Sequence, residues 1–139
     1  MNKLMHTTCW SLGVLLILCV SGRIGAQSTY QRVPLLRLLV AADENTVDGM
    51  HVSVVGYLSR RGELFLYLTK DHAEILDKAS GVPIADTVWL EIDQSSCSSY
   101  VLIMGVVARD RYSSGVVLTE IQEVRQADTQ ELCWRRSAN

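Results

Sequence analysis

The stretch that decides the fold is Met50–Thr69, MHVSVVGYLSRRGELFLYLT. Apolar and polar residues alternate on both sides of a short polar turn, Ser59–Gly62. A period of two places successive side chains on opposite faces of a β-strand. The stretch therefore predicts a hairpin of two antiparallel strands joined at the paired arginines of the turn. One face of this hairpin is aliphatic and the other includes three aromatic residues: Val52, Val54, Gly56, Leu58, Leu64, Leu66 and Leu68 on the first, and Tyr57, Phe65 and Tyr67 on the second.

Glycine interrupts two of the predicted strands at matching places. Gly56 follows four mostly apolar residues in the hairpin, and Gly105 does so in a later apolar run, Tyr100–Ala108. A glycine inside a strand marks a bulge or a sharp bend. We expect two similarly bent strands and not a duplicated domain.

The rest of the chain adds three strands and two helical segments to the hairpin. Pro34–Ala42 has apolar residues at helical spacing and predicts a short amphipathic helix. Lys70–Ala85 predicts one or two helical turns followed by a loop. The three further strands are expected at Val88–Ile92, Tyr100–Ala108 and Val116–Arg125. The predicted fold class is mainly β: a five-stranded OB-like Greek-key barrel with an N-terminal helix and a helical turn between strands two and three.

The first 26 residues have the features of a secretory signal. Lys3 precedes the apolar run Ser11–Val20, which is shorter than the roughly 18 residues that a membrane span needs. Ala26 offers a small residue for cleavage, and an uncleaved signal anchor is the alternative. Lipidation of Cys19 is not expected, because the preceding Leu18 is bulky. The expected organisation is a signal peptide over 1–26, a loose segment over 27–32, a barrel domain over 33–125 and a polar tail over 126–139.

Charge and cysteine content narrow the class of protein. The formal net charge of −2 becomes −4 without Lys3 and Arg23 of the signal. Nucleic-acid-binding domains usually carry a basic face, so single-stranded nucleic acid is the least favoured partner. Cys97 and Cys133 lie outside the signal, and an even pair in an exported chain predicts one disulfide. Two free buried thiols are the alternative. A disulfide together with a signal predicts a periplasmic or secreted protein.

Five motifs suggest a relationship to known proteins: Leu35–Leu39, Asp48-Gly49, Val52–Leu58, Leu66–Asp71 and Tyr100–Gly105. On these motifs, the chain from about Val33 to Val124 resembles a group of small, uncharacterised, exported bacterial proteins with OB-like domains. The resemblance implies a fold but no activity, because its motifs are apolar and structural. The chain departs from this group before the fourth strand, where it is shorter and has a cysteine.

The ligand-binding surface of OB-folds guides the choice of candidate residues. It is the face of strands two and three, flanked by the loops between strands one and two and strands four and five. In this chain the rule selects aromatic residues between two basic loops, the second of which also holds Tyr112. The alternative is that Pro34–Ala42 or Lys70–Ala85 covers the aromatic residues and forms a second small core with them. The candidate ligand-binding residues are Tyr57, Arg60, Arg61, Phe65, Tyr67, Trp89, Arg109 and Arg111.

No catalytic or cofactor-binding pattern stands out in the sequence. Asp71, His72 and Glu74 lack the spacing that places two metal ligands on one helical face. A nucleophile elbow, a phosphate loop and a redox C-x-x-C pair are also missing. We therefore expect no enzyme, no cofactor and no metal. The predicted function is an exported binding module for a glycan, a peptide or another envelope ligand. The alternative is a protein–protein module, such as an inhibitor, an immunity-type partner or an envelope assembly factor.

Overall fold

The computed structural model describes residues 29–41, 46–61, 63–86, 91–92, 97, 99–110 and 115–138. Within these ranges the chain is mainly β, as the sequence predicts. The expected signal segment lies outside them. The elements in chain order are β1 (Gln31–Arg32), α1 (Leu35–Val40), β2 (His51–Ser59), β3 (Phe65–Tyr67), α2 (Lys70–Glu74), η2 (Lys78–Ser80), β4 (Gly81–Pro83), β5 (Tyr100–Arg109), β6 (Val116–Gln126) and β7 (Leu132–Arg135).

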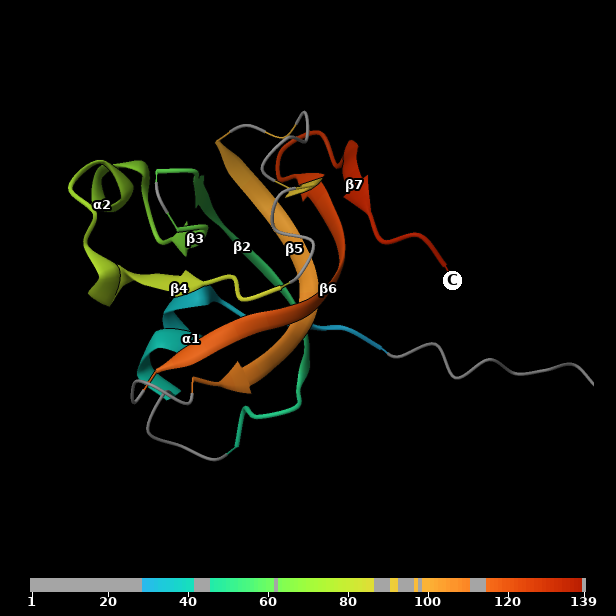
Figure 1. Ribbon diagram of the computed structural model, residues 1–139, viewed down its shortest axis with the longest axis horizontal. Coiled ribbons are helices and arrows are strands. Elements are labelled where there is room, and N and C mark those ends of the chain that lie inside the picture. The colour runs from blue at the N-terminus through green and yellow to red at the C-terminus, as the bar shows by residue number, and fades with distance from the viewer. Residues whose placement is uncertain are drawn as a thin grey trace, which may run out of the picture.

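The seven described strands form one sheet in the order β4-β3-β2-β5-β6-β7, and β1 pairs separately with β2. The pairs along this path are antiparallel, and the long strands β5 and β6 run side by side (Figure 1). The sheet curls until Ile84, just after β4, forms an isolated parallel bridge with Leu118 of β6. No ladder joins β4 to β6 beyond this bridge within the described ranges. The sheet is therefore open and holds seven described strands where the sequence predicts five.

Both glycines inside strands allow a neighbouring strand to approach closely. A Cβ atom at Gly105 would lie 2.7 Å from Ile121 Cδ1 and 2.9 Å from the Thr119 carbonyl oxygen of β6. At Gly105 the pairing of β5 with β6 shifts register, as the sequence predicts for a bulge. At Gly56 the pairing is regular, but a Cβ atom would lie 2.6 Å from Leu66 Cγ and 2.9 Å from the Tyr67 carbonyl oxygen. Such a contact is too short to be tolerated without movement of β3. Gly56 thus allows β3 to approach β2 closely.

Helix α1 forms where the sequence predicts a short amphipathic helix, with Pro34 as its N-cap residue. Leu35 and Leu38 are buried, and Arg37 is exposed. The helix contacts β2 and β4, so it closes one side of the apolar core (Figure 1). Because the helix lies over the aliphatic face of the sheet, it is not the element that covers the aromatic residues of β3.

The predicted third strand is wrong where the structure describes it. Residues 88–90 lie outside the described ranges, and Glu91 and Ile92 are helical. The strand that pairs with β3 is instead β4, within a segment expected to be a loop, with Leu66 opposite Val82. Three residues that include a glycine and a proline have little intrinsic strand preference. The strand exists because β3 offers it a partner, and this partner is fourteen or more positions away in the sequence.

Both predicted flanks of the domain take part in the sheet. The sequence predicts a loose segment at Gln31 and Arg32, but these residues form β1 and pair with Val52 and Ser53. The predicted polar tail contributes β7, which pairs with β6. None of the helices in the described part of the chain is long and apolar enough to cross a membrane.

Candidate functional site: a basic cleft beside α2

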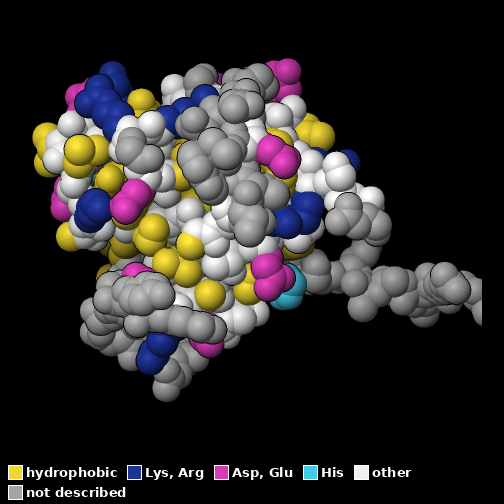
Figure 2. All heavy atoms as spheres, viewed as in Figure 1, with side chains coloured by type: hydrophobic (Ala, Val, Ile, Leu, Met, Phe, Trp, Pro, Cys, Tyr) yellow, Lys and Arg dark blue, Asp and Glu magenta, His cyan; other side chains and the backbone are white. Residues whose placement is uncertain are grey.

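A cleft of about 400 Å³ opens where β2 ends. The end of β2 and its turn form one wall, α2 forms another, and the segment before β5 forms the third. Lys and Arg side chains gather at this end of the molecule (Figure 2). The described lining residues are Tyr57, Leu58, Ser59, Arg60, Arg61, Lys70, Ala73, Glu74, Cys97 and Ser99.

Helix α2 is held in place by a cap and by one buried residue. Thr69 is the N-cap, and its Oγ1 accepts a hydrogen bond from the backbone N–H of His72 at 3.3 Å. A cap of this kind satisfies a backbone donor at the helix start. Ala73 is buried against the rings of Phe65 and Tyr67. The helix therefore presents Lys70 and Glu74 to the cleft.

The charges around the cleft are mainly positive. Arg60 donates a hydrogen bond from Nη2 to the Cys97 carbonyl oxygen, which joins two walls. Lys70 Nζ lies 3.3 Å from Glu74 Oε1, and both side chains are more than half exposed, so water screens this pair. Arg61 is exposed. Among the described lining residues, three cations face one carboxylate, which favours an anionic ligand.

Tyr57 brings an aromatic ring to the cleft. It is half-buried, and its ring meets the ring of Tyr100 edge to face, with 5.5 Å between centroids. Tyr100 itself is 40% exposed. Edge-to-face packing fixes both rings. The cleft thus combines cationic donors with the ring of Tyr57, which Tyr100 holds in place from outside the cleft.

The structure brings together three of the predicted site residues and buries two others. Tyr57, Arg60 and Arg61 line the cleft. Phe65 and Tyr67 are only 7% and 2% exposed, so their rings do not form an open surface for stacking. They stack on each other, with centroids 5.5 Å apart. The second small core considered from the sequence is therefore what the structure contains, and α2 is the element that covers it.

Two charged side chains, those of Lys78 and Glu63, lie beside this small core. Lys78 Nζ lies 5.3 Å from the centroid of the Phe65 ring and 2.8 Å from Glu63 Oε2. The hydrogen bond with Glu63 raises the pKa of Lys78. Burial raises the pKa of the Tyr67 phenol. Tyr67 is accordingly a neutral core residue.

The two predicted basic loops lie near opposite ends of β5. Tyr57 pairs with Tyr100 at the start of β5, whereas Arg109 ends that strand. A strand of ten residues spans roughly 30 Å, so Arg109 is far from the cleft. Its backbone N–H donates to Asp48 Oδ1 at 3.0 Å. The remaining candidates, Trp89 and Arg111, lie outside the described residues.

Sequence reasoning missed the part of the site that α2 supplies. Lys70 and Glu74 enter the cleft because α2 folds back over β3, and this return depends on packing and not on a local signal. Ser99 also lines the cleft, and its carbonyl oxygen accepts a hydrogen bond from the Leu58 N–H at 2.9 Å. Thr69 followed by Asp71 was the one local signal for the helix start, and it would have placed Lys70 in the first turn.

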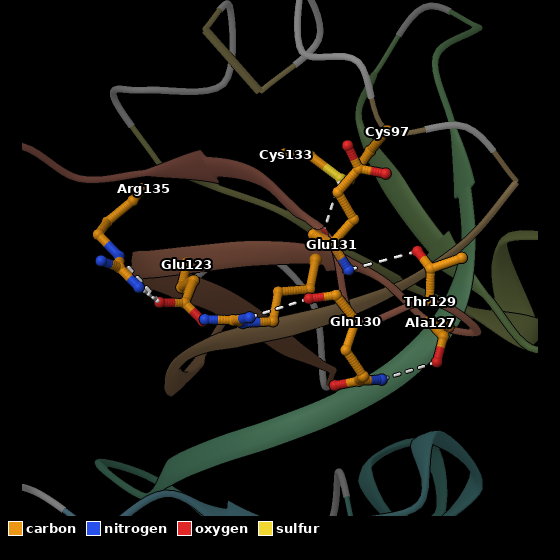
Figure 3. Close-up of polar contacts among 9 residues, drawn as sticks. Cys97, Glu123, Ala127, Thr129, Gln130, Glu131, Cys133 and Arg135 are labelled. Atoms are coloured by element: carbon orange, nitrogen blue, oxygen red, sulfur yellow. Dashed lines mark hydrogen bonds and ion pairs between the residues drawn. A yellow bond between two sulfur atoms is a disulfide. The ribbon is translucent and has the colours of Figure 1, made fainter.

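The predicted disulfide joins Cys97 to Cys133, with their Cα atoms 5.3 Å apart. It connects Cys97 in the wall of the cleft to Cys133 in β7, and Figure 3 shows the bond between the two sulfur atoms. No group of His, Cys, Asp and Glu side chains suited to a metal ion occurs among the described residues.

A second, larger cavity of about 690 Å³ lies on the other side of β3. Its walls are mainly apolar and come from β3, β4, the start of β6 and Leu39 of α1. Its charged lining residues are Glu63, Lys78 and Asp110. It therefore lacks the cationic character of the cleft.

Comparison with known proteins yields no relative: no protein-family model, no curated protein and no solved structure matches this chain.

Proposed function

We propose that this chain is an exported, non-catalytic binding module that takes an acidic glycan in the cleft beside α2. The proposal rests on one observation: a single cleft of about 400 Å³ is lined by three cationic side chains and one aromatic ring, those of Arg60, Arg61, Lys70 and Tyr57. That volume lies within the usual range of small-ligand sites.

The combination of groups favours a sugar acid over other anions. Arginine forms paired hydrogen bonds with carboxylates, which lysine alone cannot do. Aromatic rings such as that of Tyr57 pack against the apolar faces of pyranose rings. The formal net charge of the whole chain is negative, so an anionic ligand of any kind is attracted by the local cations of the cleft and not by the chain as a whole.

The same proposal includes an OB-like architecture. Its support is the path β4-β3-β2-β5-β6 together with the parallel contact of Ile84 and Leu118, since this is the connectivity of a partly open five-stranded Greek-key barrel. In that framework β1 and β7 are additions at the sheet margins. The resemblance to small exported bacterial OB-like proteins belongs to this proposal as well.

Export to the periplasm or beyond is supported by the apolar run Ser11–Val20 and by the disulfide, because disulfides persist in oxidising compartments. Cell fractionation followed by intact-mass measurement of the protein in each fraction tests it directly. Cleavage near Ala26 and no alkylation without reductant are expected. A full-length, fully alkylated chain would contradict export.

Calorimetric titration with tetragalacturonate tests the proposed ligand class, with neutral maltotetraose and a tetraglutamate peptide as comparison ligands. We expect binding of the acidic sugar, weakening as salt is raised, and no binding of the neutral one. Arg61→Ala should weaken binding about tenfold, the equivalent of one charge-assisted hydrogen bond. Arg109→Ala removes the same charge far from the cleft and should leave affinity unchanged. Equal losses in both variants, or preference for the peptide, would contradict the proposal.

One observation favours a protein–protein module as a second candidate function. Leu36 and Val40 of α1 are 57% and 72% exposed, and residues four apart lie on one side of a helix. An apolar pair of this kind suits a protein partner. The double variant Leu36→Glu and Val40→Glu should abolish co-purification of such a partner from envelope extract while sugar binding persists.

A further inference from the structure

We propose that the Cys97–Cys133 disulfide controls the affinity of the cleft, so that the oxidised protein binds its acidic ligand tightly and the reduced protein binds it weakly. This inference rests on the proposed function of the cleft and adds a means of regulating it.

The first link in the argument is the position of Cys97 in the cleft wall. Cys97 is 1% exposed and lines the cleft. Its carbonyl oxygen accepts the hydrogen bond from Arg60 Nη2. One cationic group of the site is therefore oriented by the backbone of a residue whose side chain is held in a disulfide.

The second link is the way in which the neighbouring residues attach to β2. The Leu58 N–H donates to the Ser99 carbonyl oxygen at 2.9 Å. The ring of Tyr100 packs against the ring of Tyr57. Ser99 and Tyr100 thus orient the end of β2, as Cys97 orients the arginine.

The far end of the disulfide lies on a strand at the sheet margin. Within the described ranges β7 pairs only with β6, with Glu123 opposite Arg135 and Val124 opposite Trp134. Figure 3 shows the disulfide beside the contacts of Glu123 and Arg135 that hold β7 on the sheet. Trp134 Nε1 also donates to Glu91 Oε2 at 3.0 Å. Reduction leaves that hydrogen bond in place. We therefore expect the segment before β5 to become more mobile on reduction while it stays attached to β7.

The two sulfur atoms differ in access. Cys133 is half-buried, whereas Cys97 is buried, so an external thiolate reaches the Cys133 sulfur first. The reductant is a dithiol. Its thiolate attacks the Cys133 sulfur, the S–S bond breaks, and the Cys97 thiolate leaves and takes a proton from water. The second thiol of the reductant then displaces Cys133, so the reductant becomes a disulfide and two electrons and two protons reach the protein.

Calorimetric titration with tetragalacturonate tests the proposal on the oxidised protein and on protein reduced with dithiothreitol. We expect the dissociation constant to rise at least fivefold on reduction, and the double variant Cys97→Ser and Cys133→Ser to bind as the reduced protein does. Arg60→Ala should weaken binding by the oxidised protein, and reduction of that variant should then weaken it by a smaller factor than in the native protein, because only the part of the effect that acts through Tyr57 and the end of β2 remains. Such non-additivity is expected where the disulfide acts through Arg60. The same affinity in both redox states, or the same fold-change in Arg60→Ala as in the native protein, would overturn the inference.

Amide hydrogen exchange separates this regulation from general unfolding. Reduction should speed exchange of the Leu58 N–H and leave Val54 and Ile103, in the middle of the sheet, protected. Loss of protection throughout the sheet would overturn the inference, because the disulfide would then stabilise the whole fold and not the cleft. Failure of the oxidised protein to bind any acidic probe would refute both the proposed function and this inference, whereas binding that ignores redox state refutes this inference alone.

Discussion

The two hydrophobic clusters of this molecule differ in size, in composition and in what they position. The large cluster lies between the sheet and α1 and is built almost entirely from aliphatic side chains. The small cluster lies between β3 and α2 and consists of Phe65, Tyr67 and Ala73, with Tyr57 packed against it. Both lie against the same hairpin, on opposite faces of β3.

The difference assigns separate roles to the two faces of the hairpin. The large cluster buries most of the apolar surface and so provides most of the favourable free energy of folding. The small cluster buries little, but it is the surface on which α2 lies, and α2 carries Lys70 to the cleft. We infer that damage to the first cluster unfolds the protein, whereas damage to the second changes the cleft first.

The largest effect is expected for Leu38→Ala, in the large cluster. Leu38 is fully buried, and truncation of such a leucine lowers the free energy of unfolding by about 2–5 kcal/mol. Urea denaturation measures the loss. Leu36→Ala is the matched control on the same helix, because Leu36 is 57% exposed, and it should cost no more than about 0.5 kcal/mol. Equal losses would contradict the assignment of α1 to the core, as would a changed affinity of the folded Leu38→Ala protein for tetragalacturonate.

A smaller loss of stability and a change at the cleft are expected for Phe65→Leu. The substitution keeps an apolar side chain but removes the stacking with Tyr67 and the contact with Lys78. We expect a loss of about 1–2 kcal/mol in the free energy of unfolding. Because α2 then packs less firmly, affinity for tetragalacturonate should fall about threefold, or roughly 0.6 kcal/mol.

The control for this variant is Ile75→Ala, at the end of the same helix. Ile75 is 74% exposed, and its truncation should alter neither stability nor affinity. If Phe65→Leu left the affinity intact while lowering stability, the small cluster would be an ordinary extension of the core.

The features that sequence predicted are those set by local periodicity. Alternation from Val52 to Leu68 gave the hairpin and its aliphatic face, and helical spacing gave α1. The pairing of Cys97 with Cys133 followed from their number and the expected compartment. Each of these depends on residues close together in the chain or on counting.

The features that sequence missed depend on partners far away in the chain. Gly81–Pro83 is a strand only because β3 pairs with it, and Leu132–Arg135 is one only because β6 and the disulfide hold it. Phe65 and Tyr67 alternate as outward residues should, and the sequence left open whether Pro34–Ala42 or Lys70–Ala85 covers them, whereas the structure shows that α2 buries them. Periodicity tells which side of a strand a residue takes, but not whether another element covers that side.

The smallest effect belongs to a polar contact that lies in neither cluster, and it shows itself as a dependence on pH. Burial alone would raise the pKa of Glu123, but hydrogen bonds from Arg125 and Arg135 outweigh it and the pKa is lowered. Arg135 Nη2 lies 2.6 Å from Glu123 Oε2, across the pairing of β6 with β7. A carboxyl group with a lowered pKa stabilises the folded state above its unfolded pKa, and this contribution is lost as the pH falls through the folded value.

Glu123→Gln should therefore lower the free energy of unfolding by about 1 kcal/mol at pH 7, a modest amount because Arg135 is more than half exposed. The difference from the native protein should shrink once the pH falls below 4.5, the ordinary value for this group, and vanish when the native carboxyl is protonated. Urea denaturation at a series of pH values from 7 to 3 measures it. A difference that stayed constant over this range would mean that the amide harms packing and that the charge of Glu123 contributes nothing. A difference that follows the titration would establish that the charge of Glu123 helps to bind β7 to the sheet. Because β7 carries Cys133 of the disulfide, this ion pair would also support the cleft wall, whereas both clusters are held by apolar packing.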